Sequence, residues 1–178
     1  MDARLHHVQG EAEHVTPPEL AALLQEFYRE TADLVVQRQT RARRVTAYDT
    51  NNAYQQIIGR QDVHLRWLSD AIAGLTGNVP APPAGDDGAP SNHKENVELK
   101  SVIEADGRSQ FDFIQRWTPR IESVTNARHR KMLELILGEM AEHRRVFEQA
   151  LEGRTDVLGR HSDGKILRGV VIPVRPRD

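Results

Sequence analysis

Residues 54–68 read YQQIIGRQDVHLRWL and carry the clearest helical pattern in the chain. Its apolar side chains recur at intervals of three and four positions, at Tyr54, Ile57, Ile58, Leu65 and Leu68. Because an α-helix has about 3.6 residues per turn, this spacing places them on one helical face. Two polar residues, Gln61 and His64, lie on that same face. The stretch therefore predicts an amphipathic helix with polar side chains in the middle of its buried side.

The pattern extends over a longer helix and recurs in three other segments. Asp49 or Thr50 can cap the helix around residues 54–68, and Gly77 can end it. An earlier helix is expected from residue 17 to about residue 44, opened by a capping box of Thr16 and Glu19. Two later helices are expected, one from Asn92 to about residue 124 with a kink or restart before Pro119, and one from Asn126 to Gly153.

Four such helices of roughly 26 to 29 residues can bury their apolar faces only against one another, which predicts an all-α four-helix bundle. The short connections around residues 45–48 and 124–126 predict two antiparallel hairpins. The Pro- and Gly-rich linker of residues 78–91 can reach roughly 45 Å, enough to cross the bundle and make the second and third helices parallel. The bundle is expected over residues 16–153, with a flexible arm at residues 1–15 and an irregular tail at residues 154–178.

Composition excludes several classes of protein. The 178 residues fit one domain, and the absence of cysteine excludes disulfide frameworks, zinc ribbons and cysteine nucleophiles. No apolar run approaches the roughly 18 residues of a membrane span, and residues 1–10 do not read as a secretory signal, so a cytoplasmic protein is expected. The net charge of −2 argues against a nucleic-acid partner. The basic run of Arg38, Arg41, Arg43 and Arg44 is interpreted as the solvated last turn of the first helix.

Polar residues interrupt the apolar face of every predicted helix near its middle. The first helix carries Glu26 and Glu30, the third Asp106 and Gln110, and the fourth His143. Counting from the hairpin turns places Asp106 level with His143, and His64 level with Glu30 or Glu26. Because a buried unpaired charge costs several kcal/mol, these groups are expected to pair with one another or to bind an ion.

The bundle pattern over residues 17–152, with the stretch from Gln61 to Leu68, resembles the ferritin-like superfamily of rubrerythrins and bacterioferritins. In that group the first and third helices each supply a carboxylate to a two-metal site, and the second and fourth each supply Glu-x-x-His. The resemblance implies that His64, His143 and Asp106 are metal ligands, with Glu26 or Glu30 as the ligand from the first helix. It also implies oxidation of Fe(II) or reaction with dioxygen or peroxide.

Two positions depart from the family pattern. Gln61 and Met140 stand where the family has its two bridging glutamates. A neutral amide and a thioether supply no negative charge to hold two divalent ions together. The resemblance therefore does not extend to a complete two-metal site.

Three interpretations of the polar layer follow. A single Fe, Mn or Zn ion is held by His64, His143, Asp106 and a glutamate of the first helix. Alternatively, the layer is a hydrogen-bonded core in which Asp106 pairs with His143, and Glu26 or Glu30 pairs with His64. In the third interpretation Glu139, four residues before His143, turns inward and restores a two-metal site. The functional hypotheses are a metal-binding protein with ferroxidase-type chemistry and a non-catalytic bundle that dimerises or binds a partner.

Partners are predicted from the tail and from the fold. Residues 170–174 are apolar and are flanked by Arg168, Arg175 and Arg177. This segment is expected to pack on its own bundle or on a second subunit, and the alternative is a docking peptide for another protein. A homodimer or higher homo-oligomer is therefore expected, without a nucleic-acid or membrane partner.

Overall fold

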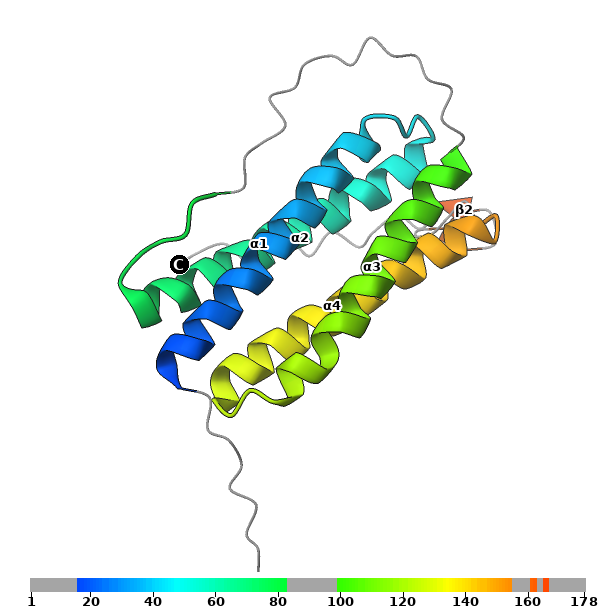
Figure 1. The fold of residues 1–178 in the computed structure, drawn as a ribbon. Helices are drawn as coiled ribbons and strands as arrows, with labels where there is room; N and C mark the ends of the chain where they lie inside the picture. Colours follow the sequence, from blue (N-terminus) through cyan, green and yellow to red (C-terminus); the bar gives the residue numbers. More distant parts are fainter. Residues whose placement is uncertain (1–15, 83–98, 155–160, 163–164, 167–178) are drawn as a thin grey trace, which may run out of the picture.

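The computed structural model describes residues 16–82, 99–154, 161–162 and 165–166. In these residues the chain forms four α-helices and one short antiparallel strand pair (Figure 1): α1 (Pro17–Ala42), α2 (Tyr48–Thr76), α3 (Leu99–Glu122), α4 (Ala127–Leu151), β1 (His161–Ser162) and β2 (Lys165–Ile166). The predicted all-α four-helix bundle is confirmed. Several predicted segments lie outside the described residues: the arm of residues 1–15, residues 83–91 of the linker, the helix start at Asn92, and residues 155–160, 163–164 and 167–178 of the tail.

The helix ends are set by the residues that the sequence singles out. The Glu19 carboxylate accepts hydrogen bonds from the backbone N–H and the hydroxyl of Thr16 at 2.7 and 2.8 Å, which opens α1. The side chain of Asn126 accepts the backbone N–H of His129 at 3.2 Å and opens α4. Gly77 follows α2 with a φ of +73°, a conformation that glycine adopts without a steric penalty.

Three predicted boundaries differ from the structure. α1 ends at Ala42 rather than near residue 44, and α2 begins at Tyr48, with Ala47 in place of Asp49 or Thr50 at the N-cap. α3 continues through Pro119 to Glu122, so of the predicted kink or restart the restart does not occur. Pro119 has no N–H to bond to the carbonyl of residue 115, but only three residues of α3 follow it, so little of the helix lies beyond the lost bond.

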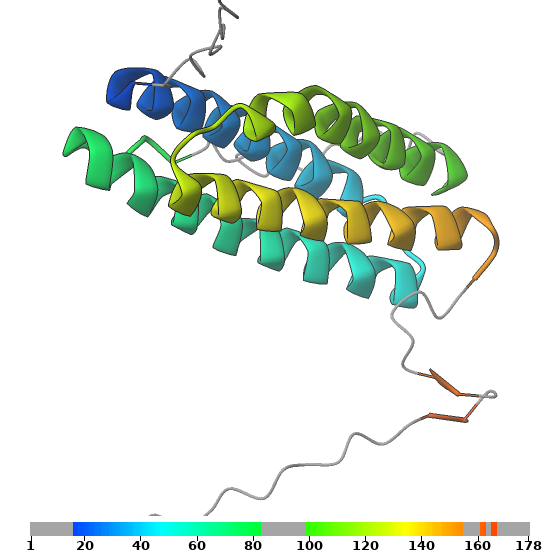
Figure 2. The same ribbon diagram turned by 90° about the horizontal axis from the view of Figure 1, so that it is seen from below.

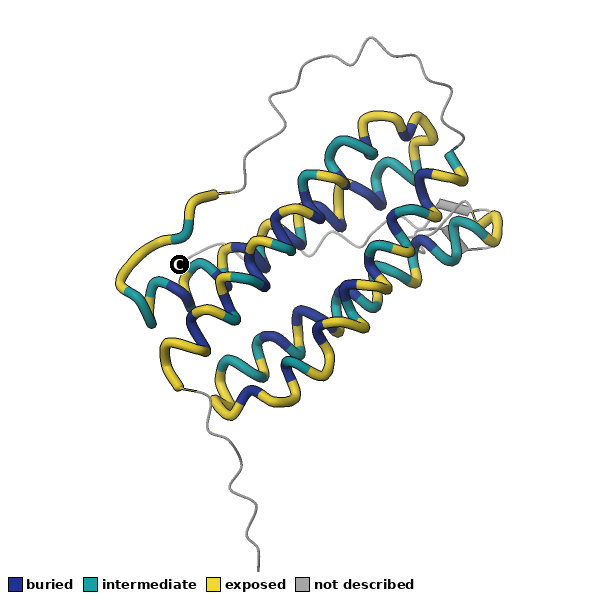
Figure 3. The backbone as a smooth tube through the Cα atoms, in the orientation of Figure 1, coloured by how far each residue is buried: buried dark blue, intermediate teal, exposed yellow. Residues whose placement is uncertain are grey.

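The bundle consists of two antiparallel hairpins, α1 with α2 and α3 with α4 (Figure 1). The hairpins stack so that α1 lies beside α3 and α2 lies beside α4, while α2 and α3 run in the same direction (Figures 1 and 2). Buried residues line the inner face of every helix (Figure 3). In the centre Phe27 packs edge-on against Phe113 and Trp117, with ring centroids 5.2 and 4.8 Å apart. None of the helices in the described segments has the length and apolar character that a membrane span needs.

Candidate functional site

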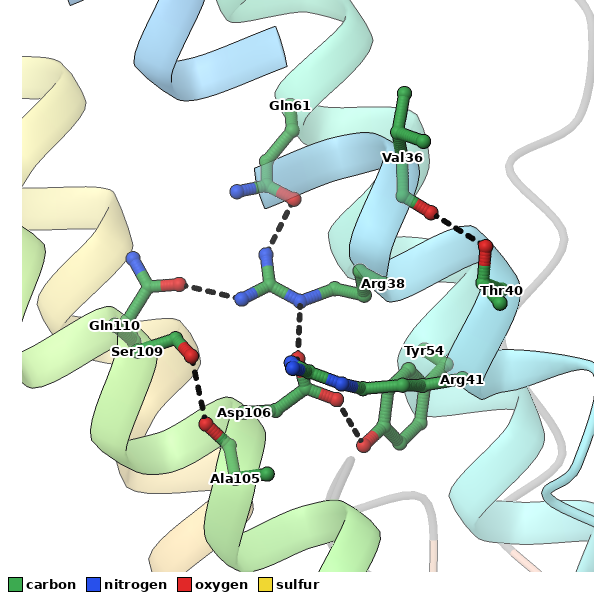
Figure 4. A network of polar contacts seen from close by, with 10 residues as sticks. All are labelled: Val36, Arg38, Thr40, Arg41, Tyr54, Gln61, Ala105, Asp106, Ser109 and Gln110. Atoms are coloured by element: carbon green, nitrogen blue, oxygen red, sulfur yellow. Dashed lines mark hydrogen bonds and ion pairs between the residues drawn. The ribbon is translucent and has the colours of Figure 1, made fainter. Parts of the chain in front are cut away.

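Arg38 occupies the centre of the polar layer. It lies on the inner face of α1 and is completely buried. Its guanidinium donates hydrogen bonds to the side-chain oxygens of Gln61 on α2 and Gln110 on α3, the latter at 2.7 Å (Figure 4). The Arg38 Nε atom lies 3.7 Å from the Asp106 carboxylate of α3. One cationic side chain therefore connects three helices.

Asp106 balances this buried positive charge. Its Oδ1 atom accepts a hydrogen bond from Arg41 at 2.8 Å, and its Oδ2 atom accepts the Tyr54 hydroxyl at 2.7 Å. Burial raises the pKa of Tyr54, and the neighbouring negative charge of Asp106 raises it further, so the phenol remains a donor. Burial lowers the pKa of Arg38, and Asp106 opposes that effect by stabilising the charged guanidinium. Asp106 therefore faces two arginines and a hydroxyl.

The two glutamines are oriented by Arg38. Because both side-chain oxygens accept its N–H groups, the NH₂ groups of Gln61 and Gln110 turn away from it (Figure 4). Neither amide nitrogen has a hydrogen-bond partner in the described part of the chain. A metal ion needs lone pairs, whereas this layer presents N–H donors and a fixed guanidinium charge. The donor set around Arg38 and Asp106 does not fit a metal ion.

A second polar cluster joins α2 to α4. His64 is completely buried, and its Nε2 atom lies 2.7 Å from an oxygen of Glu139. Arg60, one turn before His64, binds both oxygens of Glu139 through Nε and Nη2. The His143 ring stacks on the His64 ring, with centroids 6.4 Å apart and planes 28° from parallel. Two imidazoles, one carboxylate and one guanidinium thus lie together.

The environment fixes the charges of this cluster. Burial lowers the pKa of His64, and burial together with the positive charge of Arg38 lowers the pKa of His143 to about 4. Hydrogen bonds from Arg60 and His64 hold the pKa of Glu139 at about 2. At neutral pH both imidazoles are therefore uncharged and Glu139 is ionised, which are the forms in which these side chains bind metal ions.

Both imidazoles carry an unsatisfied nitrogen. The Nδ1 atoms of His64 and His143 are buried, and nothing in residues 16–82 or 99–154 bonds to them. A buried polar group without a hydrogen bond typically costs about 1–3 kcal/mol. These two nitrogens are therefore the atoms of the cluster that are still able to bond to a further group.

A groove opens beside this cluster between α2 and α4. Its volume is about 450 Å³, and His143 and Arg60 form part of its wall. The other lining residues are mostly small or apolar: Gln56, Ile57, Gly59, Val63 and Val146. A small molecule can therefore approach the exposed side of His143.

Glu26 and Glu30 lie away from both clusters, between α1 and α3. Glu26 accepts a hydrogen bond from Arg120 at 2.8 Å, and Glu30 accepts one from the Trp117 indole at 2.8 Å. Both carboxylates are partly exposed. The predicted pairing of either glutamate with His64 is wrong, because Glu139 takes that place.

The predicted pairing of Asp106 with His143 is also wrong, since Asp106 binds Arg38, Arg41 and Tyr54. Arg38, predicted in a solvated turn, is buried. The missed signal is its spacing, because Arg38 follows Leu34 by four residues and Val35 by three. Arg43 and Arg44 are exposed, as predicted.

The six predicted ligands thus fall into three places: Asp106 with Arg38; Glu26 and Glu30 between α1 and α3; and His64, His143 and Glu139 between α2 and α4. In the arrangement seen across the described residues, no three His, Asp or Glu side chains converge closely enough to hold an ion. No family model, curated protein or solved structure matches the chain.

Proposed function

We propose that the chain is a ferritin-like bundle that binds one Fe, Mn or Zn ion through His64, Glu139 and His143. The observation that carries the proposal is the pair of buried, unsatisfied imidazole nitrogens beside an ionised carboxylate. Two neutral imidazoles and one carboxylate are a common ligand set for these metals. His64 faces Glu139 with Nε2, so an ion held by Glu139 reaches the unsatisfied Nδ1 atom only after the ring has turned.

The residues of the cluster have separate tasks in this proposal. His64 and His143 offer neutral nitrogens, and Glu139 offers the negative charge that attracts a cation. The groove lined by Gly59, Val63 and Val146 admits small molecules to the side of the cluster where His143 lies. A bound Fe(II) supplies one-electron chemistry toward dioxygen or peroxide, the reaction class that the family resemblance implies.

Metal titration tests the proposal. Protein purified without a His tag and treated with a chelator is titrated with Zn²⁺, Mn²⁺ and, without oxygen, Fe²⁺, and binding is followed by calorimetry and metal analysis. We expect one ion per chain, and at least a hundredfold weaker binding in the His64→Ala/His143→Ala double variant. Glu139→Gln is expected to weaken binding at least tenfold.

His129→Gln is the matched control, because His129 lies in the first turn of α4, far along the helix from His143, and its ring bonds to the neighbouring Asn126 side chain. Its affinity is expected to equal that of the wild type. Circular dichroism checks that each variant is folded. The proposal is overturned if none of the three metals binds at one ion per chain, either to the wild type or to an Arg60→Met variant.

A non-catalytic bundle is the second candidate, and Arg38 is the observation that favours it. Its guanidinium supplies, at the centre of the bundle, the positive charge that a metal would bring. In this alternative the protein acts by dimerising or by binding a protein partner, and the polar core serves only the fold. The same titration separates the two candidates, because this one predicts no ion in any variant.

A further inference from the structure

Arg60 and His64 compete for one carboxylate. They lie four residues apart on α2 and therefore point to the same side of that helix. Arg60 binds both oxygens of Glu139, and His64 contacts one of them. Both oxygens of the only carboxylate in the cluster are thus already in use. An ion can gain Glu139 as a ligand only if this arrangement opens.

Arg60 is the member of the cluster that can leave. Its side chain is 41% exposed, whereas that of His64 is completely buried. It forms part of the groove wall, so solvent lies beside it. Its guanidinium also lies over the Trp67 ring, 5.0 Å from the centroid, and the His64 ring lies 5.7 Å from the same indole. Trp67 therefore contacts both competing groups.

We infer that the Arg60 guanidinium competes with a metal ion for the Glu139 carboxylate. This inference rests on the proposed function. Without a metal, its guanidinium neutralises Glu139 and holds the site closed. A divalent ion displaces Arg60 from Glu139 into the groove, and the imidazoles rotate toward the ion. The affinity for metal is thus set by the ligands and by the strength of the Arg60–Glu139 pair that must break.

Replacing the competitor tests this inference. Arg60→Met keeps the apolar stem and removes the charge, so its dissociation constant for Zn²⁺ is expected to fall at least tenfold. Arg66→Met is the matched control, because Arg66 is an exposed arginine on the same helix and lies away from Glu139. Its dissociation constant is expected to change less than threefold.

Trp67 gives a second readout that does not depend on activity. Its emission is expected to change when Zn²⁺ moves Arg60, and this change is expected to be smaller in Arg60→Met and absent in Trp67→Phe. Calorimetric titration of Trp67→Phe checks that the site still binds the ion.

The outcomes are distinguishable. Tighter binding by Arg60→Met alone supports the inference, and so does binding by Arg60→Met when the wild type stays empty. Equal gains in Arg60→Met and Arg66→Met would reduce the effect to net charge and overturn it. Unchanged or weaker binding in Arg60→Met would overturn it while the metal site stands. Absence of binding in both wild type and Arg60→Met would remove the proposed function as well.

Discussion

The bundle contains two polar regions. Both hold buried polar atoms without a hydrogen bond in the described residues, among them Arg38 Nε in the first, and the regions differ in that a groove reaches the second. Around Arg38 and Asp106, opposite charges face each other, and Tyr54 and Arg41 add donors to the same carboxylate. Between α2 and α4, two imidazole nitrogens stay unsatisfied although a groove opens beside them. Charges that are paired deep in the core serve the fold. Unsatisfied groups next to an opening mark the place where a ligand is expected.

Both regions connect the two hairpins through charged side chains. Packing between hairpins is less extensive than packing within each hairpin. Arg38 of the first hairpin bonds to Gln110 of the second, and Arg60 of the first bonds to Glu139 of the second. Because such contacts form in only one alignment, we expect them to favour one arrangement of the hairpins over alternatives with similar apolar burial.

The largest effect is expected from removing the charge at the centre. Arg38→Met leaves Asp106 buried with fewer partners and removes the donors to two amides, so the free energy of unfolding is expected to fall by about 3–5 kcal/mol. Urea denaturation followed by circular dichroism measures this change.

Arg44→Met, at an exposed arginine just beyond α1, is the control and is expected to stay within about 0.5 kcal/mol of the wild type. The double variant Arg38→Met/Asp106→Leu is expected to recover part of the loss, because the buried carboxylate is then gone as well. Arg41, which loses its partner, is 28% exposed and can be solvated by water. A loss below about 1 kcal/mol in Arg38→Met would show that the core does not depend on this pairing.

The second region predicts a specific response to acid. The pKa of His143 is about 4 in the folded chain, below the ordinary value of 6.5. The unfolded chain therefore binds more protons between these pH values, so the stability from a neutral His143 is complete above pH 6.5 and is lost as the pH falls toward 4. The lowered pKa of His64 acts in the same direction. Urea denaturation at a series of pH values measures the effect.

His143→Gln is the comparison, since glutamine stays neutral throughout this range. Its free energy of unfolding is expected to depend less steeply on pH between 6.5 and 4 than that of the wild type. Below pH 4 the two proteins are expected to lose stability in parallel, because Glu139 takes up a proton near pH 4.5 in the unfolded chain but only near its pKa of about 2 in the folded chain. Identical pH dependence across the whole range would contradict the buried neutral state of His143.

The helices and the polar layer could be predicted from the sequence because both depend on spacing. Gln61, His64, Asp106 and Gln110 are predicted on the inner faces and are buried. Counting residues from the turns gives a height along the bundle but no rotation about the helix axis. For this reason Glu30, at a height predicted to match His64, lies instead between α1 and α3.

The pairing within the layer could not be predicted from spacing. Arg38 belongs to a basic run, and its charge predicts an exposed side chain. Its position on the helix, in line with Leu34 and Val35, predicts a buried one, and it is buried. Once Arg38 is inside, it attracts Asp106 and leaves His143 without the predicted partner. A wrong prediction for Arg38 therefore leads to a wrong prediction for the partner of Asp106 and for that of His143. Whether Glu139 meets Arg60 or a metal depends on side-chain conformations that the sequence alone does not specify.

The smallest effect is expected between α1 and α3, where the contacts are partly exposed. The Glu30 carboxylate accepts the Trp117 indole N–H at 2.8 Å and bonds to Arg116 at 2.6 Å, with 28% of the Glu30 side chain exposed. In Glu30→Gln the amide oxygen can still accept the indole proton, and water screens the lost ion pair. The free energy of unfolding is therefore expected to fall by about 1 kcal/mol or less.

Urea denaturation, with Trp117 emission as a second probe, measures this loss beside that of Arg38→Met. Both residues connect the first hairpin to α3. The two variants therefore compare a partly exposed contact, that of Glu30, with a fully buried one, that of Arg38. A loss in Glu30→Gln as large as that in Arg38→Met would mean that the partly exposed contacts, rather than the buried charges, hold the hairpins together.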